Sequence, residues 1–353
     1  RVDSHAAAAL EGRFVIQVDS VGGTLLREDP QAAGARLLLG RPTPTVGRDK
    51  EIGLLQGIYT ELVEDGTPRA ALITGPAGIG KSRVRTELQQ RIEMMDRRPD
   101  VLICRGDPMS RGSSLSALGR ALRSLMGIHD GEHRDEQIHK VKAHVAARMP
   151  RTLRFLSAFL GELIGVEFPD QFDEPLRAAR ASAQLMQSRM QMALEAFVRA
   201  QAEHAPQVVI IEDTHWSDDT TLDLIDWLLG CADLRFVVFA FARPDLLARQ
   251  PALWDRRNVT RLTLAPLSPV ASDRLVSAAL PGADPGTRAN IVSRAAGNAL
   301  FLEELIRCAA EGRDELPLTV QAVVQLRLDR MSPEVRRVLR AAAVFGQVFW
   351  TGG

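Results

Sequence analysis

The sequence is short of net charge, of cysteine and of long apolar runs. Lys and Arg together number 44, as do Asp and Glu, so the 353 residues carry no formal net charge. No long run of one sign is present either. A protein that grips nucleic acid mainly through phosphates is usually more basic than this. The composition therefore gives no support for direct DNA or RNA binding.

The three cysteines, Cys104, Cys231 and Cys308, stand far apart and fit neither a metal pair nor a disulfide framework. No apolar run approaches the length that spans a bilayer, and "HAAAAL" near the start lacks the long apolar region of a signal peptide. We therefore expect a protein of the reducing cytoplasm, without membrane association. The chain begins at Arg1 without Met and stops in "FWTGG", which suggests a piece of a longer protein.

The length of the chain favours one large domain with smaller pieces around it. Residues 1–40 hold one alternating stretch, at Phe14, Ile16 and Val18, and a Gly-Gly turn, which predict a small β-hairpin in an upstream tail or linker. The two prolines of "RPTPTVGRDKE" stiffen the chain and disfavour helix just before them. They predict a domain boundary near Arg41.

Strand-like runs alternate with helical ones after that boundary, at 70–74, 101–104, 208–211, 236–242 and 259–264. This alternation predicts an α/β fold in which helices cover both faces of a parallel sheet. Residues 113–205 are mostly helical, and beyond "APLSP" the pattern turns entirely helical. One Met-bearing segment has the spacing of a helix stripe that faces the core, rather than of a ligand site. Its members are Leu185, Met186, Met190, Leu194, Phe197 and Val198.

A phosphate-binding loop follows the first of these strands. "GPAGIGKS", Gly75 to Ser82, matches G-x-x-x-x-G-K-[ST] between a strand-like and a helical run. Gly75, Gly78 and Gly80 allow tight turns that bring N–H groups onto phosphate oxygens, and the next helix presents its positive end to the same anion. Lys81 would reach the β and γ phosphates, and Ser82 would bind Mg²⁺. This context favours ATP or ADP binding over a chance Gly-rich turn. The other positions assigned to the nucleotide are Pro76, Ala77, Ile79 and Arg83.

Two adjacent acids end the run "VVIIED", residues 208–213. Glu212 is the first acid after the buried strand and is the candidate Mg²⁺ partner, through water. Asp213 points differently and can hold the attacking water in line with the γ-phosphate, as a base or as a positioning group. The alternative is that both acids only cap a strand end. The following "SDD" is a good start for the helix "TTLDLIDWLL", while His215 and Trp216 stay open between function and packing.

A single arginine ends the strand "FVVFAFA". Arg243 stands at its C-terminal edge, where ligands of parallel sheets bind, and can sense the γ-phosphate. A surface ion pair between Arg243 and Asp245 is the alternative. The residue type alone does not decide between these two hypotheses.

The motifs "TVGRDKE", "GPAGIGKS", "VVIIEDTHWSDD", "FARP" and "AAGNALFLEEL" together resemble those of signal-transduction ATPases with numerous domains, the STAND branch of the AAA+-like phosphate-loop NTPases. The chain looks most like the bacterial ATPases attached to Ser/Thr kinases, nucleotide cyclases and LuxR-type regulators. The resemblance covers about residues 41–350. It implies a phosphate-loop NTPase core over 41–265, a helical lid over 266–316 and the truncated start of a winged-helix domain over 317–353.

By the same resemblance Val46, Gly47 and Arg48 would lie against the nucleotide, Glu212 and Asp213 would form the Walker B pair, and Arg243 would be the γ-phosphate sensor. In this family a Gly-x-Pro in the lid packs on the adenine. Here Gly297, Asn298 and Ala299 take that place, and Ala cannot supply the proline ring. Implied partners are an upstream kinase or cyclase domain, downstream winged-helix and repeat domains, and an ATP-dependent homo-oligomer.

Three functions fit these motifs. The leading hypothesis is a regulatory switch that binds ATP and Mg²⁺ and hydrolyses ATP slowly. The second is a module that holds ADP or ATP as a structural cofactor without turnover, a reading that Glu212 and Ala299 keep open. The third is a small-molecule phosphotransferase, which the paired acids and the large helical lid disfavour.

Overall fold

A computed structural model of the protein describes residues 14–19, 22–28, 37–39, 41–107, 115–129, 131–171, 173–312, 319, 325, 328 and 332–343. The chain divides into two compact units that interleave along the sequence. The larger unit contains Gly53–Ala77, Arg91–Leu264 and Met331–Gly353. The smaller unit contains Arg1–Ile52, Gly78–Gln90 and Ala265–Arg330. The domain limits inferred from the sequence stay predictions.

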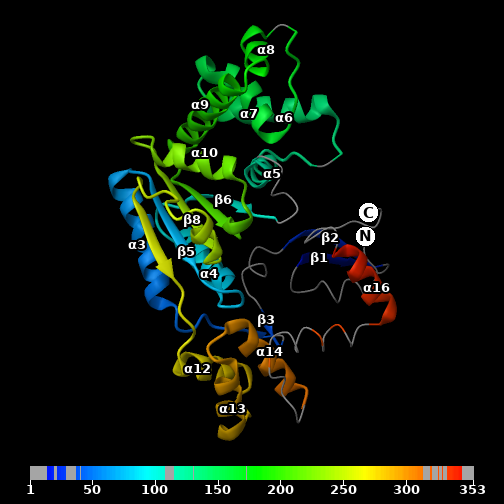
Figure 1. Ribbon diagram of the computed structural model, residues 1–353. Helices are drawn as coiled ribbons and strands as arrows, with labels where there is room; N and C mark the ends of the chain where they lie inside the picture. Colours follow the sequence, from blue (N-terminus) through cyan, green and yellow to red (C-terminus); the bar gives the residue numbers. More distant parts are fainter. Residues whose placement is uncertain are drawn as a thin grey trace. The chain divides into compact units, whose positions relative to one another are not determined.

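A parallel five-stranded sheet forms the centre of the larger unit (Figure 1). In spatial order its strands are β6 (Asp100–Arg105), β7 (Gln207–Glu212), β8 (Phe236–Ala242), β5 (Arg69–Thr74) and β9 (Val259–Thr263). Every residue of β8 is buried, as expected for a central strand covered on both faces. All five strands predicted from the apolar runs are confirmed, and none of their ends is displaced by more than one residue.

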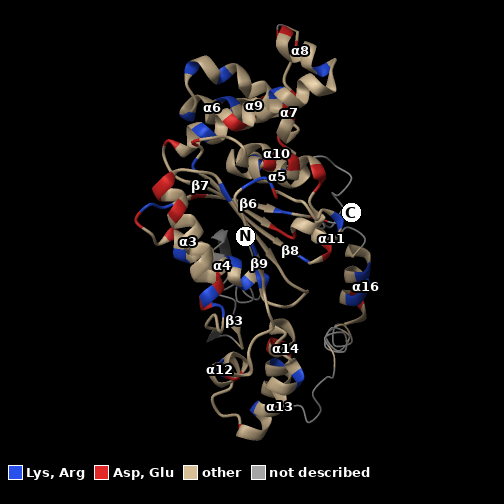
Figure 2. Ribbon diagram, turned by 60° about the vertical axis from the view of Figure 1, so that its left-hand side comes forward, with Lys and Arg blue, Asp and Glu red and all other residues tan. Residues whose placement is uncertain are grey.

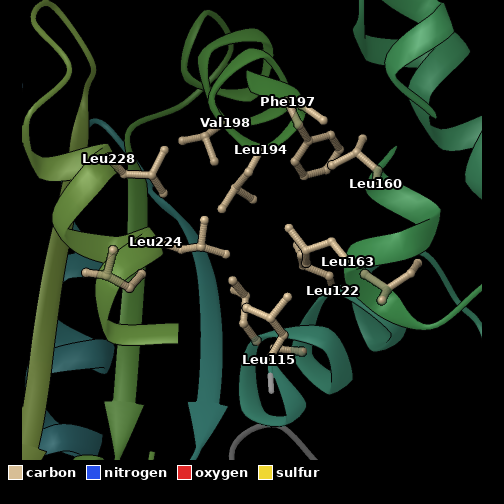
Figure 3. Close-up of a cluster of buried hydrophobic side chains, with 14 of the residues drawn as sticks. Leu115, Leu122, Leu160, Leu163, Leu194, Phe197, Val198, Leu224 and Leu228 are labelled. Carbon is tan, nitrogen blue, oxygen red and sulfur yellow. The ribbon is translucent and has the colours of Figure 1, made fainter. Parts of the chain in front are cut away.

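Helices inserted between β6 and β7 build most of the larger unit's remaining core. They are α5 (Ser116–Leu125), α6 (Arg134–Arg148), η2 (Arg151–Leu156), α7 (Ser157–Ile164), α8 (Glu174–Arg180) and α9 (Ala183–Ala202). Leucines of α5 and α7, together with Leu194 and Phe197 of α9, meet Leu224 and Leu228 of α10 (Asp219–Leu229) in one cluster (Figure 3). The stripe predicted on α9 therefore faces the core, with its Met residues at the edge of the cluster.

Three lid helices and two short antiparallel strand pairs belong to the smaller unit. Ser268, Asp284 and Asn298 cap α12 (Pro269–Ala279), α13 (Pro285–Ala295) and α14 (Ala299–Ala310) by accepting N–H groups of the first turn. Apolar residues of the three helices bury one another in a core of their own. The strand pairs are β1 (Phe14–Asp19) with β2 (Gly22–Glu28), and β3 (Leu37–Leu38) with β4 (Arg41–Pro42).

The remaining helices of residues 49–312 are α3 (Asp49–Asp65), α4 (Lys81–Glu93), the short 3-10 helix η3 (Thr214–Trp216) and α11 (Asp245–Arg249). Within 317–353, where the sequence predicts the start of a winged helix, the structure describes α16 (Pro333–Ala342) with a few flanking and isolated residues, and the rest lies outside the described residues.

Charges of both signs share the same helices, for example α6 and α9, in agreement with the zero net charge (Figure 2). In the part of the chain that the structure describes, no helix is long and apolar enough to cross a membrane.

Candidate nucleotide-binding site

The phosphate loop lies where its sequence predicts, after β5 and before α4. Its first residue, Gly75, is buried, and its N–H donates to the Ala242 carbonyl at 3.2 Å. Gly78 and Gly80 have φ angles of +78° and +104°, values that residues with a side chain rarely adopt. Helix α4 begins at Lys81, so its first-turn N–H groups follow the loop directly. The loop has the local form of an anion-binding turn.

The smaller unit holds the segment 43–48 against the second half of the loop. Arg48 is only 4% exposed, and its Nη2 donates to the Ile79 carbonyl at 3.0 Å while Nη1 pairs with Glu51 at 3.1 Å. Arg48 therefore supports the loop's backbone through a buried guanidinium. A Cβ on Gly47 would lie 2.7 Å from the Ala271 side chain, and Val46 packs on the lid core. The segment predicted to lie against the nucleotide thus also joins the loop to the lid.

Arg83 fastens the start of α4 to the same segment. Its Nε donates to Thr45 Oγ1 at 2.8 Å, and its Nη2 donates to the Thr43 carbonyl. Thr45 in turn donates to Glu87 at 2.8 Å. These bonds give the Arg83 guanidinium a supporting role within the protein, and its assignment to the nucleotide stays a prediction.

The beginning of α14 lies directly on the phosphate loop within the smaller unit. The Leu300 N–H donates to the Gly78 carbonyl at 2.9 Å. A Cβ on Gly78 would lie 2.6 Å from Asn298 Oδ1, the same atom that caps α14 by accepting the Phe301 N–H at 3.1 Å. Ala299 lies 3.6 Å from the place of a Cβ on Gly80. The predicted lid residues are therefore in contact with the loop.

Gly297 is required by its surroundings. Its φ is +76°, and a Cβ there would lie 2.6 Å from the Leu267 carbonyl oxygen. The Leu267 N–H donates to the Gly297 carbonyl at 2.9 Å, which closes the start of α14 onto the segment before α12. Gly297 is therefore needed because the backbone of Leu267 lies too close for a side chain at this position.

The two predicted Walker B acids differ in backbone and surroundings. Glu212 ends β7, and its carboxylate accepts the Arg105 Nε–H at 2.7 Å. Asp213 has left the strand conformation, with φ 50° and ψ 43° in the left-handed region. Gly106 makes room for this turn, because a Cβ on it would lie 2.3 Å from the Asp213 carbonyl oxygen. The predicted difference in direction between the acids therefore has a backbone cause.

Strand order decides where Arg243 stands. Because β8 pairs with β7 on one side and β5 on the other, Arg243 leaves the sheet between the start of the phosphate loop and Glu212. Its side chain is exposed. Among the described residues no salt bridge joins Arg243 to Asp245, so the surface-pair alternative finds no support.

The sequence analysis missed Arg105 and one of the two contacts that Asp218 makes. Arg105 ends β6 and carries a charge at the C-terminal end of a buried strand, a signal that could have been used. Asp218 caps α10 through the Thr221 N–H at 2.8 Å and also accepts the Leu115 N–H at 2.9 Å. The helix cap by Asp218 could be predicted from "SDD". The bond to Leu115 could not, because the two residues are 103 positions apart and no local pattern links them.

Two residues that the sequence assigns to magnesium, Ser82 of the smaller unit and Glu212 of the larger unit, carry oxygen atoms. Mg²⁺ prefers oxygen ligands and normally combines one or two protein oxygens with phosphate and water. The Ser82 hydroxyl and the Glu212 carboxylate are oxygen donors of the type that Mg²⁺ prefers. Ser82 is exposed and Glu212 is partly buried. Among the described residues there is no cluster of three or more His, Cys, Asp or Glu that would hold a metal without the phosphates.

A strand, a glycine-rich loop and a helix in this order, with acids after a second parallel strand, define the phosphate-loop nucleoside triphosphatases. The profile of the AAA ATPase domain matches residues 44–241, more than half of the chain. The protein belongs to that family of ATPases.

A curated relative, an uncharacterized protein of Rhizobium meliloti (strain 1021), is 27% identical over 328 residues. The match covers 86% of this chain but 30% of the relative, so the chain spans less than a third of that protein's length.

Two solved structures resemble the chain at 14% identity. One is a signal transduction ATPase with numerous domains and a tetratricopeptide repeat sensor from Pyrococcus horikoshii, with TM-score 0.47 and coverage of 86% of this chain and 36% of that one. The other is Aeropyrum pernix ORC1 in complex with DNA, with TM-score 0.46 and coverage of 85% and 69%. At these scores neither likeness bears on the function of this chain.

Proposed function

We propose that this chain is the ATP-binding, slowly ATP-hydrolysing switch module of a larger signalling protein, and that the nucleotide on the phosphate loop sets the position of the lid. The carrying observation is the bond from the Leu300 N–H to the Gly78 carbonyl at 2.9 Å. It joins the first turn of a lid helix to the backbone of the loop that would hold the phosphates.

The physical basis is the unsatisfied end of α14. The first N–H groups of a helix have no partner inside the helix, so Gly78 and Asn298 supply acceptors for two of them. A change in the loop that turned the Gly78 carbonyl away would cost about 1 kcal/mol of helix stability. A ligand shifts a conformational equilibrium only through contacts that differ between the two states. The proposal is that the bond from Leu300 to the Gly78 carbonyl is kept in one nucleotide state and lost in the other.

The proposed roles follow the residue chemistry. Loop N–H groups and Lys81 bind the phosphates, and Ser82 and Glu212 hold Mg²⁺, which neutralises the charge of the phosphates. Asp213 orients the attacking water, and Arg243 contacts the γ-phosphate. We also propose kinase, cyclase, winged-helix or repeat domains as covalent partners and an ATP-dependent homo-oligomer as the assembly. The greater length of the Rhizobium relative supports a multidomain context.

A second function, a module that keeps ADP or ATP bound without hydrolysis, is favoured by one observation. Arg105 already neutralises Glu212 across 2.7 Å, which disfavours Mg²⁺ at that carboxylate. Ala299 in place of the family's proline adds to this alternative.

Two measurements on the purified protein separate the hypotheses. Mass spectrometry of released nucleotide, followed by calorimetric titration, should find ATP or ADP bound. Phosphate release from added MgATP should then be slow but above that of Lys81→Ala. Bound nucleotide with no turnover would favour the storage module, and no binding of either nucleotide would sink both proposals.

A further inference from the structure

Two buried residues directly after the proposed Walker B acids connect the end of β7 to the end of β8 and to Arg243, the residue after it. Thr214 and His215 are 0% and 1% exposed. Thr214 Oγ1 lies 3.1 Å from both the Ile211 and the Phe241 carbonyl oxygens. His215 Nδ1 accepts the backbone N–H of Arg243 at 3.4 Å. We call these bonds the Thr214–His215 clamp.

The clamp begins where the backbone ladder stops. The last paired residues of the two strands are Ile211 and Ala240, and Asp213 then turns into the left-handed region. Parallel strands that end this way have no further ladder bonds to keep their ends together. The side chains of Thr214 and His215 take over, and the His215 carbonyl adds a third link by accepting Arg249 Nη1 at 3.2 Å.

Asp213 and Arg243 stand at the two ends of this clamp. Arg243 is exposed, so its long side chain has rotamer freedom, and the direction in which it starts is set by its backbone. The bond from its N–H to His215 fixes that backbone relative to the turn that carries Asp213. The His215 ring itself is held by packing, with its centroid 5.1 Å from that of Trp216.

We propose that His215 is a positioning residue: it fixes the backbone of Arg243 relative to the turn that carries Asp213, and it is not an acid or base of the reaction. The proposal rests on the proposed function for the roles of Arg243 and Asp213. An imidazole nitrogen accepts a hydrogen bond only when it carries no proton, so the bond from the Arg243 N–H needs the lone pair of Nδ1. The near-complete burial of His215 also keeps it from solvent.

Two substitutions separate positioning from simple space-filling. His215→Asn keeps an acceptor near the place of Nδ1 but loses ring volume, whereas His215→Leu keeps apolar volume and loses the acceptor. Positioning predicts that Leu lowers ATP turnover by about tenfold, the scale of one lost hydrogen bond, with ADP affinity within about twofold of the parent. Asn should recover most of the turnover. Space-filling predicts the reverse order.

Amide hydrogen exchange at Arg243 tests the clamp without any nucleotide. Protection of this amide should fall in His215→Leu and persist in His215→Asn. Thr214→Val, which keeps shape and removes the hydroxyl, is the second variant in case His215→Leu does not fold, and it should also lower turnover. The matched control is His144→Leu, a half-buried histidine of α6 that lies outside the clamp.

The outcomes are distinguishable from those for the proposed function. Unchanged Arg243 protection in His215→Leu, or equal turnover in the Leu and Asn variants, would overturn the positioning role. If the parent binds nucleotide but shows no turnover, the switch proposal fails. The ratio of ATP to ADP affinity then replaces turnover, and it must move in the Leu variant and recover in the Asn variant for positioning to stand.

Discussion

The guanidinium of Arg105 donates from Nε to Oε2 of Glu212 at 2.7 Å, so the acid proposed to bind the metal already has a cation beside it. The Glu212 side chain is 14% exposed and that of Arg105 is 66% exposed, which leaves the pair open to exchange with another cation. Arg105 at the end of β6 and Mg²⁺ would therefore compete for one carboxylate.

Removing that competitor should ease metal binding. In Arg105→Ala we expect half-maximal MgATP binding at an Mg²⁺ concentration lower by up to about fivefold, since a partly exposed ion pair contributes about 1 kcal/mol or less. Arg105→Lys keeps a positive charge, so its Mg²⁺ requirement should fall between those of the parent and of Arg105→Ala. Calorimetric ATP titrations over a series of Mg²⁺ concentrations measure the effect. A higher Mg²⁺ requirement in the Ala variant would mean that Arg105 orients Glu212 for the metal.

Lys81 should carry phosphate binding without a role in folding. Lys81→Ala is expected to abolish tight MgATP binding while leaving thermal unfolding near that of the parent, because the side chain is absent from the buried core. Lys142→Ala, a change of an exposed lysine on α6, is the matched control and should bind normally. An unchanged dissociation constant in Lys81→Ala would show that the loop is not the site.

The two acids should separate in their effects. Asp213→Asn is expected to keep nucleotide binding and lower turnover by about 100-fold or more, in the range for a lost general base or water-positioning group. Glu212→Gln should instead raise the Mg²⁺ needed for ATP binding. Initial rates and titrations on both variants provide the comparison. Parental hydrolysis by Asp213→Asn would contradict this division of roles.

Gly106 should be needed for the turn at Asp213. A methyl group at this position would lie 2.3 Å from the Asp213 carbonyl oxygen, so Gly106→Ala must displace that backbone. We expect a loss of about 1–3 kcal/mol in unfolding free energy and a fall in turnover. Gly53→Ala, on an exposed helix position with nothing within 4 Å of the new Cβ, is the control and should gain about 0.5–1 kcal/mol. Denaturant titrations of both variants test the contrast.

The lid should respond to the nucleotide state. We expect ADP to protect residues 268–312 from amide exchange more than a non-hydrolysable ATP analogue does, because the start of α14 is bonded to the phosphate loop. Arg243→Ala should erase this difference and leave ADP affinity nearly unchanged. Arg256→Ala, at another exposed arginine, should preserve it. Matching profiles in the parent would leave an ATP-binding domain without a switch.

Sequence alone determined the strands, the phosphate loop and the order of the motifs. The apolar runs of β7 and β8 can be read locally, because a short continuous apolar run is typical of a strand that is buried on both faces. The glycines at 78 and 80 are equally local, since positive φ is a property of single residues. The core-facing stripe of α9 followed from helical spacing in the same way.

Only the tertiary structure decided which residues meet at the sheet edge. Arg105 and Glu212 are 107 positions apart, and they pair because β6 and β7 are neighbours in parallel register. His215 reaches the Arg243 N–H because β8 is inserted between β7 and β5. The Gly78 carbonyl accepts a bond from a helix more than 200 positions later. Strand order and helix docking arise from the burial of whole faces, so no local pattern of residues encodes these partners.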